Sequence, residues 1–145
     1  MKNGFTLIEL IFVIVLIGVL SGIGFYMSRP DYTRQDAQYT LLKLKEARYR
    51  AMGNNALDPS GCVTLTPSAL SSDEAPKHEI KSVITMVPNV TTVCFDGTGR
   101  PHDGNSVTLS TLIRSDLNIF FNNGDKNSTI RLFSGTGYAI IPCNN

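Results

Sequence analysis

The chain has 145 residues and a formal net charge of +1 at pH 7. This length is enough for one small domain plus an anchoring segment. The nearly balanced charge excludes overall electrostatic attraction as a driving force for binding nucleic acid.

One carboxylate interrupts the apolar N-terminal segment. The segment reads Gly4-Phe5-Thr6-Leu7-Ile8-Glu9 and continues as an apolar run from Leu10 to Leu20. A charge at bilayer depth costs roughly 2.5–3.5 kcal/mol and needs a partner, but no Lys or Arg lies between Phe5 and Ser28. If the chain is cut after Gly4, the new α-amine of Phe5 is a cation near neutral pH. This amine is the expected partner of Glu9, which predicts subunits that align with one another inside a membrane.

The first helix is predicted over the 23 residues from Phe5 to Met27. At about 1.5 Å per residue such a helix spans roughly 34 Å, enough to cross a bilayer. Lys2 precedes the apolar segment, and a positive charge there keeps the N-terminal end in the cytoplasm. We therefore expect a transmembrane segment followed by a head over 30–145. The signal described next implies the finer division, with a leader peptide over residues 1–4 and a transmembrane and assembly half over 5–29.

The run Lys2-Asn3-Gly4-Phe5-Thr6-Leu7-Ile8-Glu9-Leu10 resembles the class III signal of type IV pilins and pseudopilins. The resemblance implies that a prepilin peptidase cleaves after Gly4 and N-methylates Phe5, and that Glu9 is the assembly charge. It also implies other pilin or pseudopilin subunits and an inner-membrane assembly platform as partners, with the head in the periplasm. An uncleaved signal anchor and a Sec-type signal cleaved near Ser21 are alternatives, and Glu9 within the apolar run argues against the second.

A second helical segment is predicted over residues 31–53. Pro30 disfavours helix at the residue before it, so we expect a kink or a melted turn between two halves of one long helix. An apolar stripe with helical spacing should pack on the sheet of the head; its members are Ala37, Leu41, Leu44, Ala47 and Ala51. Gly53-Asn54-Asn55 is expected to end the helix.

Five basic residues form a candidate patch for nucleic acid, the alternative partner. Four lie on the second helix and one follows a glycine-rich turn; they are Lys43, Lys45, Arg48, Arg50 and Arg100. A solvated helix face is the competing interpretation of this charge pattern.

Short strands are predicted after the second helix. Alternating or apolar runs favour strands over 62–66, 80–87, 90–96, 107–113, 117–121, 130–133 and 138–141. Pro67 to His78 is predicted to be a polar surface loop, and residues 97–101 a turn. The order of elements predicts an α+β pilin fold, in which one long N-terminal helix precedes an antiparallel sheet between residues 62 and 143.

This order also resembles the GspH/FimT group of minor pseudopilins and pilins. That group has an Arg/Ala-containing helix end, a strand ending in Phe-x-x-x-Gly-Arg and a last hairpin that turns on a Gly. The matching segments are 46–51, 95–100 and 135–137. DNA-binding members carry Arg after the Gly of the last hairpin, whereas this chain has Tyr138. We predict a minor pilin or pseudopilin subunit of a type II secretion pseudopilus or a type IV pilus, and a DNA-binding pilin of natural competence is the alternative.

Three cysteines, Cys62, Cys94 and Cys143, allow one disulfide in a head outside the cytoplasm. Cys62 and Cys94 each fall on the polar face of a predicted strand, and this phase weakly favours their pairing. Cys94 with Cys143 is the competing pair, and both pairings stay open.

The sequence shows no constellation typical of an enzyme. Its two imidazoles, His78 and His102, lie in polar contexts, and His102-Asp103 is expected in an exposed turn. The chain has no nucleophile elbow, zinc-protease motif or phosphate-binding loop, and it has no EF-hand spacing. We therefore expect no enzymatic activity, no cofactor and no metal site, with calcium held by Asp96, Asp103 and Asp125 as the alternative.

Overall fold

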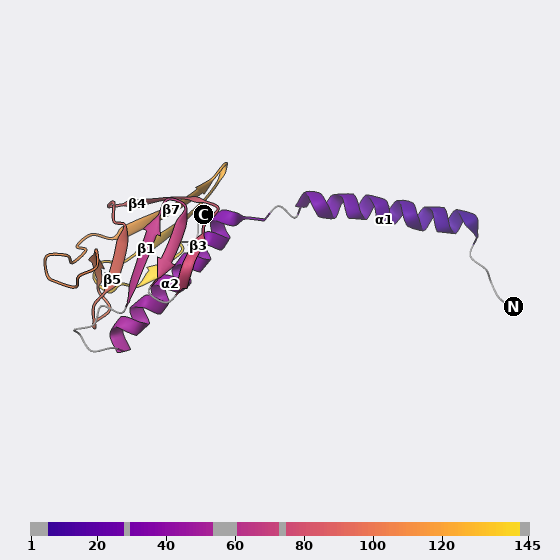
Figure 1. Ribbon diagram of the computed structural model, residues 1–145. Coiled ribbons are helices and arrows are strands. Elements are labelled where there is room, and N and C mark those ends of the chain that lie inside the picture. The colour runs from indigo at the N-terminus through magenta and orange to yellow at the C-terminus, as the bar shows by residue number, and fades with distance from the viewer. Residues whose placement is uncertain (1–5, 28–29, 54–60, 73–74, 143–145) are drawn as a thin grey trace. The chain divides into compact units, whose positions relative to one another are not determined.

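The computed structural model describes residues 6–27, 30–53, 61–72 and 75–142. The chain separates into two compact units, Met1–Pro30 and Asp31–Asn145 (Figure 1). The predicted cleavage site at Gly4 and Phe5, the expected helix end at Asn54-Asn55 and the third cysteine, Cys143, lie outside the described residues.

The first unit contains α1 (Leu7–Met27), a helix of 21 residues. The carbonyl of Thr6 accepts the backbone N–H of Glu9 at 3.0 Å and of Leu10 at 3.2 Å, which satisfies two donors of the first turn. The predicted first helix is therefore present. However, none of the helices in the described ranges is long and apolar enough to count as a membrane span, so the predicted transmembrane half over 5–29 is not identified as one.

The head begins with α2 (Tyr32–Gly53), a helix of 22 residues. Pro30 and Asp31 are not helical, which fits the melted turn predicted between the two helical halves. Pro30 cannot donate a backbone hydrogen bond, and Asp31 caps the new helix instead. Its carboxylate accepts hydrogen bonds from Thr33 Oγ1 at 2.7 Å and from the Arg34 N–H at 3.3 Å. These bonds, led by the one from Thr33, hold the pKa of the Asp31 carboxyl below its ordinary value.

The apolar stripe predicted on α2 packs on the sheets. Four of its members are buried and Leu41 is partly buried against the core. Thr40 and Asp36 lie on the same side of the helix and are also buried, although the stripe did not include them. The Asp36 carboxylate accepts hydrogen bonds from the Lys81 N–H at 3.1 Å, the Ser82 N–H at 2.9 Å and the Ser82 hydroxyl at 2.7 Å. Asp36 thus fastens α2 to the segment before β4.

Nine strands occur in the described part of the head. They are β1 (Cys62–Thr66), β2 (Ala69–Ser72), β3 (Ala75–Glu79), β4 (Val83–Val87), β5 (Thr92–Phe95), β6 (Pro101–Asp103), β7 (Leu117–Asn123), β8 (Lys126–Leu132) and β9 (Ala139–Ile140). One sheet has the order β3-β2-β1-β5-β6 and the other β4-β7-β8-β9, with every pairing antiparallel. The predicted α+β class, a helix followed by antiparallel sheet, is confirmed.

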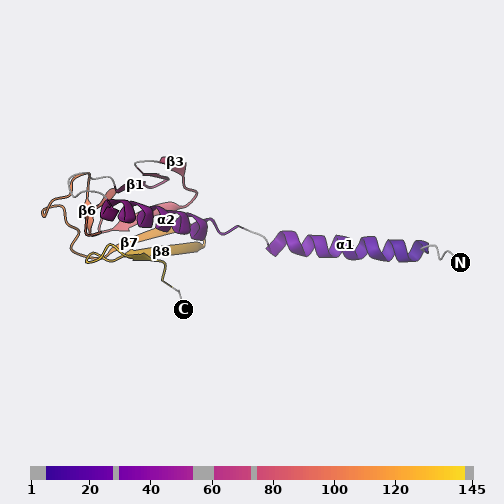
Figure 2. The same cartoon turned by 90° about the horizontal axis from the view of Figure 1, so that it is seen from below.

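The core of the head lies where α2 meets both sheets. In Figure 2 the helix passes between β1 on one side and β7 and β8 on the other, and it contacts strands of both sheets. Burial of large apolar side chains drives this packing; the largest fully buried ones include Phe95, Phe121, Leu44, Leu65, Leu70, Leu117, Ile119, Ile130 and Leu132.

The predicted surface loop over 67–78 is instead mostly sheet. Pro67 and Ser68 form a tight turn that brings Ala69 opposite Thr66, and β2 continues along β1 from there. In this strand the Leu70 side chain is 1% exposed and belongs to the hydrophobic core. The polar composition of the segment hid this strand, since β-structure depends on neighbours as much as on local sequence.

The predicted strand over 107–113 forms turns and makes a single bridge, from Leu112 to His102. The strand β6 pairs with β5 where a turn was expected. The Thr111 hydroxyl accepts the Thr108 N–H at 3.0 Å and donates to the Ser106 carbonyl at 2.9 Å. Such side-chain bonds to nearby backbone compete with a strand ladder. The alternation of apolar and hydroxyl residues therefore produced a folded loop rather than a strand.

Candidate assembly segment and junction of the head

α1 runs from Leu7 to Met27, and Glu9 is its single charged residue. It lies in the first turn of the helix with an exposed side chain. The positive end of the helix dipole favours a carboxylate at this position. The partner expected from the sequence, the Phe5 amine, lies outside the described residues.

The apolar side chains of α1 point in every direction around the helix. All of its described side chains, from Leu7 to Ser21, are exposed, and Leu7 is 77% and Leu20 67% exposed. A helix that is apolar on all sides is stable when lipid or other protein covers it. The segment is therefore built to contact something other than water.

Two of the candidate basic residues flank one carboxylate on α2. Lys43 Nζ lies 2.8 Å from Glu46 Oε2, and Arg50 Nη2 lies 2.6 Å from Glu46 Oε1. The hydrogen bond from Lys43, together with the charge of Arg50, holds the pKa of the Glu46 carboxyl below its ordinary value. Lys45, on the same helix, lies over the Tyr138 ring at 5.9 Å from its centroid.

The two remaining basic residues hold loops. Arg48 Nε donates to the Thr136 carbonyl at 3.0 Å, and Arg100 Nε donates to Asp96 Oδ2 at 2.9 Å. All five members of the candidate patch therefore have partners within the head.

The three segments that resemble the GspH/FimT group meet at one junction. Arg48 reaches from the end of α2 to the last hairpin, and a Cβ at Gly137 would collide with the carbonyl oxygen of Gly99. Gly99 and Gly137 both have positive φ, +83° and +62°. A side chain at Gly99 would also meet Arg48 and Met52 of α2. The two glycine-rich turns thus pack on each other and on the helix, so a close backbone approach requires both glycines.

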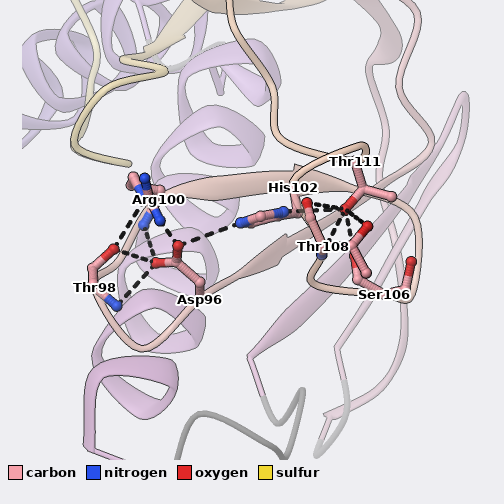
Figure 3. A network of polar contacts seen from close by, with 7 residues as sticks. All are labelled: Asp96, Thr98, Arg100, His102, Ser106, Thr108 and Thr111. Atoms are coloured by element: carbon pink, nitrogen blue, oxygen red, sulfur yellow. Dashed lines mark hydrogen bonds and ion pairs between the residues drawn. The ribbon is translucent and has the colours of Figure 1, made fainter.

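A polar network holds the 96–100 turn of this junction (Figure 3). Asp96 accepts hydrogen bonds from the Thr98 hydroxyl at 2.6 Å and from the Arg100 N–H at 2.8 Å. His102 connects the Asp96 carboxylate, at 3.4 Å from Nε2, to the Thr111 hydroxyl, at 3.1 Å from Nδ1. Burial alone would raise the pKa of Asp96, but the hydrogen bonds from Thr98, Arg100 and His102 outweigh it and hold that pKa well below its ordinary value.

His102 differs from its prediction, because it is 3% exposed on β6 instead of lying in an exposed turn. An aspartate, an imidazole and a hydroxyl in a row resemble the order of groups in a hydrolase triad. The Thr111 hydroxyl, however, is occupied by the loop backbone at Ser106 and Thr108. The network therefore ties the 104–112 loop to the 96–100 turn. The polar residues of this stretch matched no known spacing, so the sequence carried no signal for the network.

The structure joins Cys62 and Cys94 by a disulfide. The two residues lie directly opposite each other on β1 and β5, with 4.1 Å between their Cα atoms. This is the pair that strand phase favoured. Across the described ranges, no group of three or more His, Cys, Asp or Glu side chains is arranged to hold a metal ion.

The comparison with known proteins finds a match at the start of the chain. Residues 1–25 match the family model described as the prokaryotic N-terminal methylation motif. No curated protein and no solved structure matches the chain. The matched motif is that of precursors of type IV pilins and pseudopilins, and it supports a pilin-like precursor that prepilin peptidase processes.

Proposed function

We propose that this chain is a minor pilin or pseudopilin subunit that assembles into a filament through α1. The observation that carries the proposal is a single helix, directly after the methylation motif, that is apolar on all sides and holds one carboxylate near its start. Before assembly the segment is covered by the inner membrane, and in the filament by the α1 helices of neighbours. Moving between two apolar surroundings avoids most of the cost of exposing it to water.

In this proposal prepilin peptidase cleaves after Gly4 and methylates Phe5. The methylated amine of one subunit meets the Glu9 carboxylate of its neighbour and sets the axial register. An ion pair in an apolar bundle is costly when one partner is missing, so it selects the aligned arrangement over shifted ones. The head then lies in the periplasm, and the assembly platform of the inner membrane receives the processed subunit.

The chain acts as an assembly protein rather than an enzyme. The Asp96–His102–Thr111 row is the arrangement closest to a catalytic one, and its hydroxyl is held by loop backbone. The junction between the end of α2, the 95–100 segment and the last hairpin supports the GspH/FimT type within the pilin-like proteins. Because all five candidate cations have partners, the DNA-binding alternative gains no support and is not proposed.

The proposal is tested by removing the Glu9 charge in cells that assemble the filament. We expect Glu9→Gln to be trimmed before Phe5 normally, as seen by intact mass, but to be incorporated at least about tenfold less. That change corresponds to about 1.4 kcal/mol. Incorporation is measured by shearing filaments from the cells and immunoblotting.

The matched control is Glu46→Gln, which removes a carboxylate from the head and is expected to incorporate normally. Equal incorporation of Glu9→Gln and the parent chain would refute the register mechanism. A chain that retains residues 1–4 in membrane extracts would refute processing itself.

A further inference from the structure

The tip of the β7–β8 hairpin carries a signal for covalent modification. Residues Asn127-Ser128-Thr129 fit the pattern Asn-x-Ser/Thr, and Asn89-Val90-Thr91 is its other occurrence in the sequence. This pattern is the acceptor of N-linked glycans in exported proteins, where it is expected at the surface. The pattern alone does not distinguish the two sites, but their structural surroundings do.

Asn127 lies near the start of β8 and is exposed. Its amide makes no hydrogen bond with any group in the described ranges, so Nδ2 is not committed to the fold. Along β8 the buried residues alternate with outward ones, and Asn127 and Thr129 lie on the outward face while Ser128 is buried. The acceptor amide and the hydroxyl two residues later are therefore presented on one side. Asp125, two residues before the acceptor, is also exposed.

The hairpin tip is an exposed end of its sheet. Its last two residue pairs are Asn122 with Asn127 and Asn123 with Lys126, and all four residues are exposed. Gly124, with φ of +62°, forms the turn between them. Opening these two pairs moves no residue of the hydrophobic core, and among the described residues it breaks only the exposed contacts from Asn123 Nδ2 to the Lys81 carbonyl, at 3.4 Å, and from Lys126 to Asp31, at 3.9 Å. Presenting the whole pattern also separates Ser128 from Phe121 and Thr129 from Phe120.

The Asn89 pattern includes a residue of the hydrophobic core. Asn89 is exposed, but the central residue of its pattern, Val90, is 4% exposed and belongs to the hydrophobic core of the head. An enzyme that draws this segment into its own active site must pull Val90 out of the core. The two patterns thus differ at their middle residue, which is a core valine in one and a serine outside the hydrophobic core in the other.

We propose that Asn127 is the acceptor of an N-linked glycan. The co-reactant is a lipid-linked glycosyl diphosphate bound to a separate transferase. Asn127 Nδ2 attacks C1 of the first sugar, the N–C1 bond forms, and the bond between C1 and the diphosphate oxygen breaks. The lipid diphosphate leaves with the bonding electron pair, and one amide proton passes to a base of the transferase. No group is oxidised or reduced.

The experiment uses the full chain purified from the membranes of its own cells. Trypsin cuts after Lys126 and after Arg131, so residues 127–131 form one peptide with a single Asn, separate from the peptide that contains Asn89. We expect fragmentation of the 127–131 peptide to show a glycan on Asn127. Asn127→Gln should lose the glycan mass completely, and Thr129→Ala should lower occupancy at least about tenfold.

Two matched variants separate the acceptor from the fold. Thr129→Ser keeps the hydroxyl and Asn89→Gln removes the other pattern, and both should retain the glycan. An unmodified 127–131 peptide from the parent chain, glycan mass that persists in Asn127→Gln, or a glycan on Asn89 alone would each overturn the inference.

The inference rests on the proposed function, because the head must leave the cytoplasm to meet the transferase. The same intact-mass spectrum keeps the two apart. A chain that begins at Phe5 and carries no glycan refutes the modification alone, whereas a chain that retains residues 1–4 refutes the processing.

Discussion

The two helices of this chain use their side chains in opposite ways. α1 exposes apolar residues all around, and its one charge stands in the first turn. α2 buries one stripe against two sheets and pairs Lys43 and Arg50 with Glu46 on its surface. The first helix therefore has an apolar surface on every side, whereas the second has one face that packs in the core of the head. Substitutions in the two helices should affect different measurements.

The largest effect is expected from the disulfide between Cys62 and Cys94, which closes a loop with a sequence separation of 32 residues. Cys62→Ser should lower the free energy of unfolding by about 3–4 kcal/mol, because the unfolded chain regains loop entropy. Thermal unfolding of the full chain in detergent, followed by near-ultraviolet circular dichroism, measures the loss. The parent chain treated with reductant is the control and should unfold at a similarly lowered temperature. Unchanged unfolding in both would show that the bond contributes nothing to the head.

A buried and an exposed leucine on α2 provide the next test. Leu44 is 1% exposed and Leu42 is 61% exposed. Leu44→Ala should cost about 3 kcal/mol through lost burial and the cavity left in the core. Leu42→Ala, the same substitution two residues away, should cost less than about 0.5 kcal/mol. Equal losses in chemical denaturation would contradict the orientation of α2.

The junction of the glycine turns is tested by two glycines of one hairpin. Gly137 has positive φ, and an added Cβ would collide with the Gly99 carbonyl, whereas Gly135 has open space. Gly137→Ala should destabilise the head by about 2–3 kcal/mol. Gly135→Ala should change the free energy of unfolding by less than about 0.5 kcal/mol. A hairpin that tolerates both substitutions equally would show that the two turns do not touch.

The Asp96 network predicts a dependence on acid. The pKa of Asp96 is lower in the folded head than in the unfolded chain, where it is about 3.9. Its contribution to stability is therefore complete above the unfolded-state value and is lost as the pH falls toward the lowered folded-state value. Between roughly pH 5 and pH 2 the unfolding temperature of the parent chain should fall more steeply than that of Asp96→Asn. If the unfolding temperatures of the two proteins fell in parallel with pH, the Asp96 network would not contribute to the acid dependence of the head's stability.

The smallest effect on the head is expected from α1. Phe12→Ala removes a ring that is 63% exposed, so the unfolding temperature of the head should stay within experimental error of the parent chain. Filament incorporation, measured by shearing and immunoblotting, is the quantity that should change. A lowered unfolding temperature would show that the head depends on α1, and the contrast between the two helices would fail.

Local sequence was sufficient where the physical cause is local. The order of residues from Lys2 to Glu9, the lone charge of α1 and the break at Pro30 all act within a few residues of one another. The apolar stripe of α2 is likewise visible in spacing, since a regular helix converts spacing into a face. These local features are enough to indicate the pilin-like class.

Prediction from the sequence was wrong where a residue's role depends on its neighbours in the folded structure. The strand β2 exists because Leu70 finds β1, and the 107–113 segment folds into turns because Thr111 reaches its own backbone. His102 is buried because a loop closes over it. Strand propensity averages over such neighbours, so it cannot anticipate them.

The sequence by itself determined the processing motif, the apolar helix with its single acid, and the α+β order of elements. The tertiary structure decided between the two candidate cysteine pairs, showed that the five candidate cations have partners, and showed how deeply the middle residue of each Asn-x-Thr pattern is buried. The physical reason is that the first set depends on the periodicity and order of neighbouring residues. The second set depends on distances between residues far apart in the chain, which packing alone fixes.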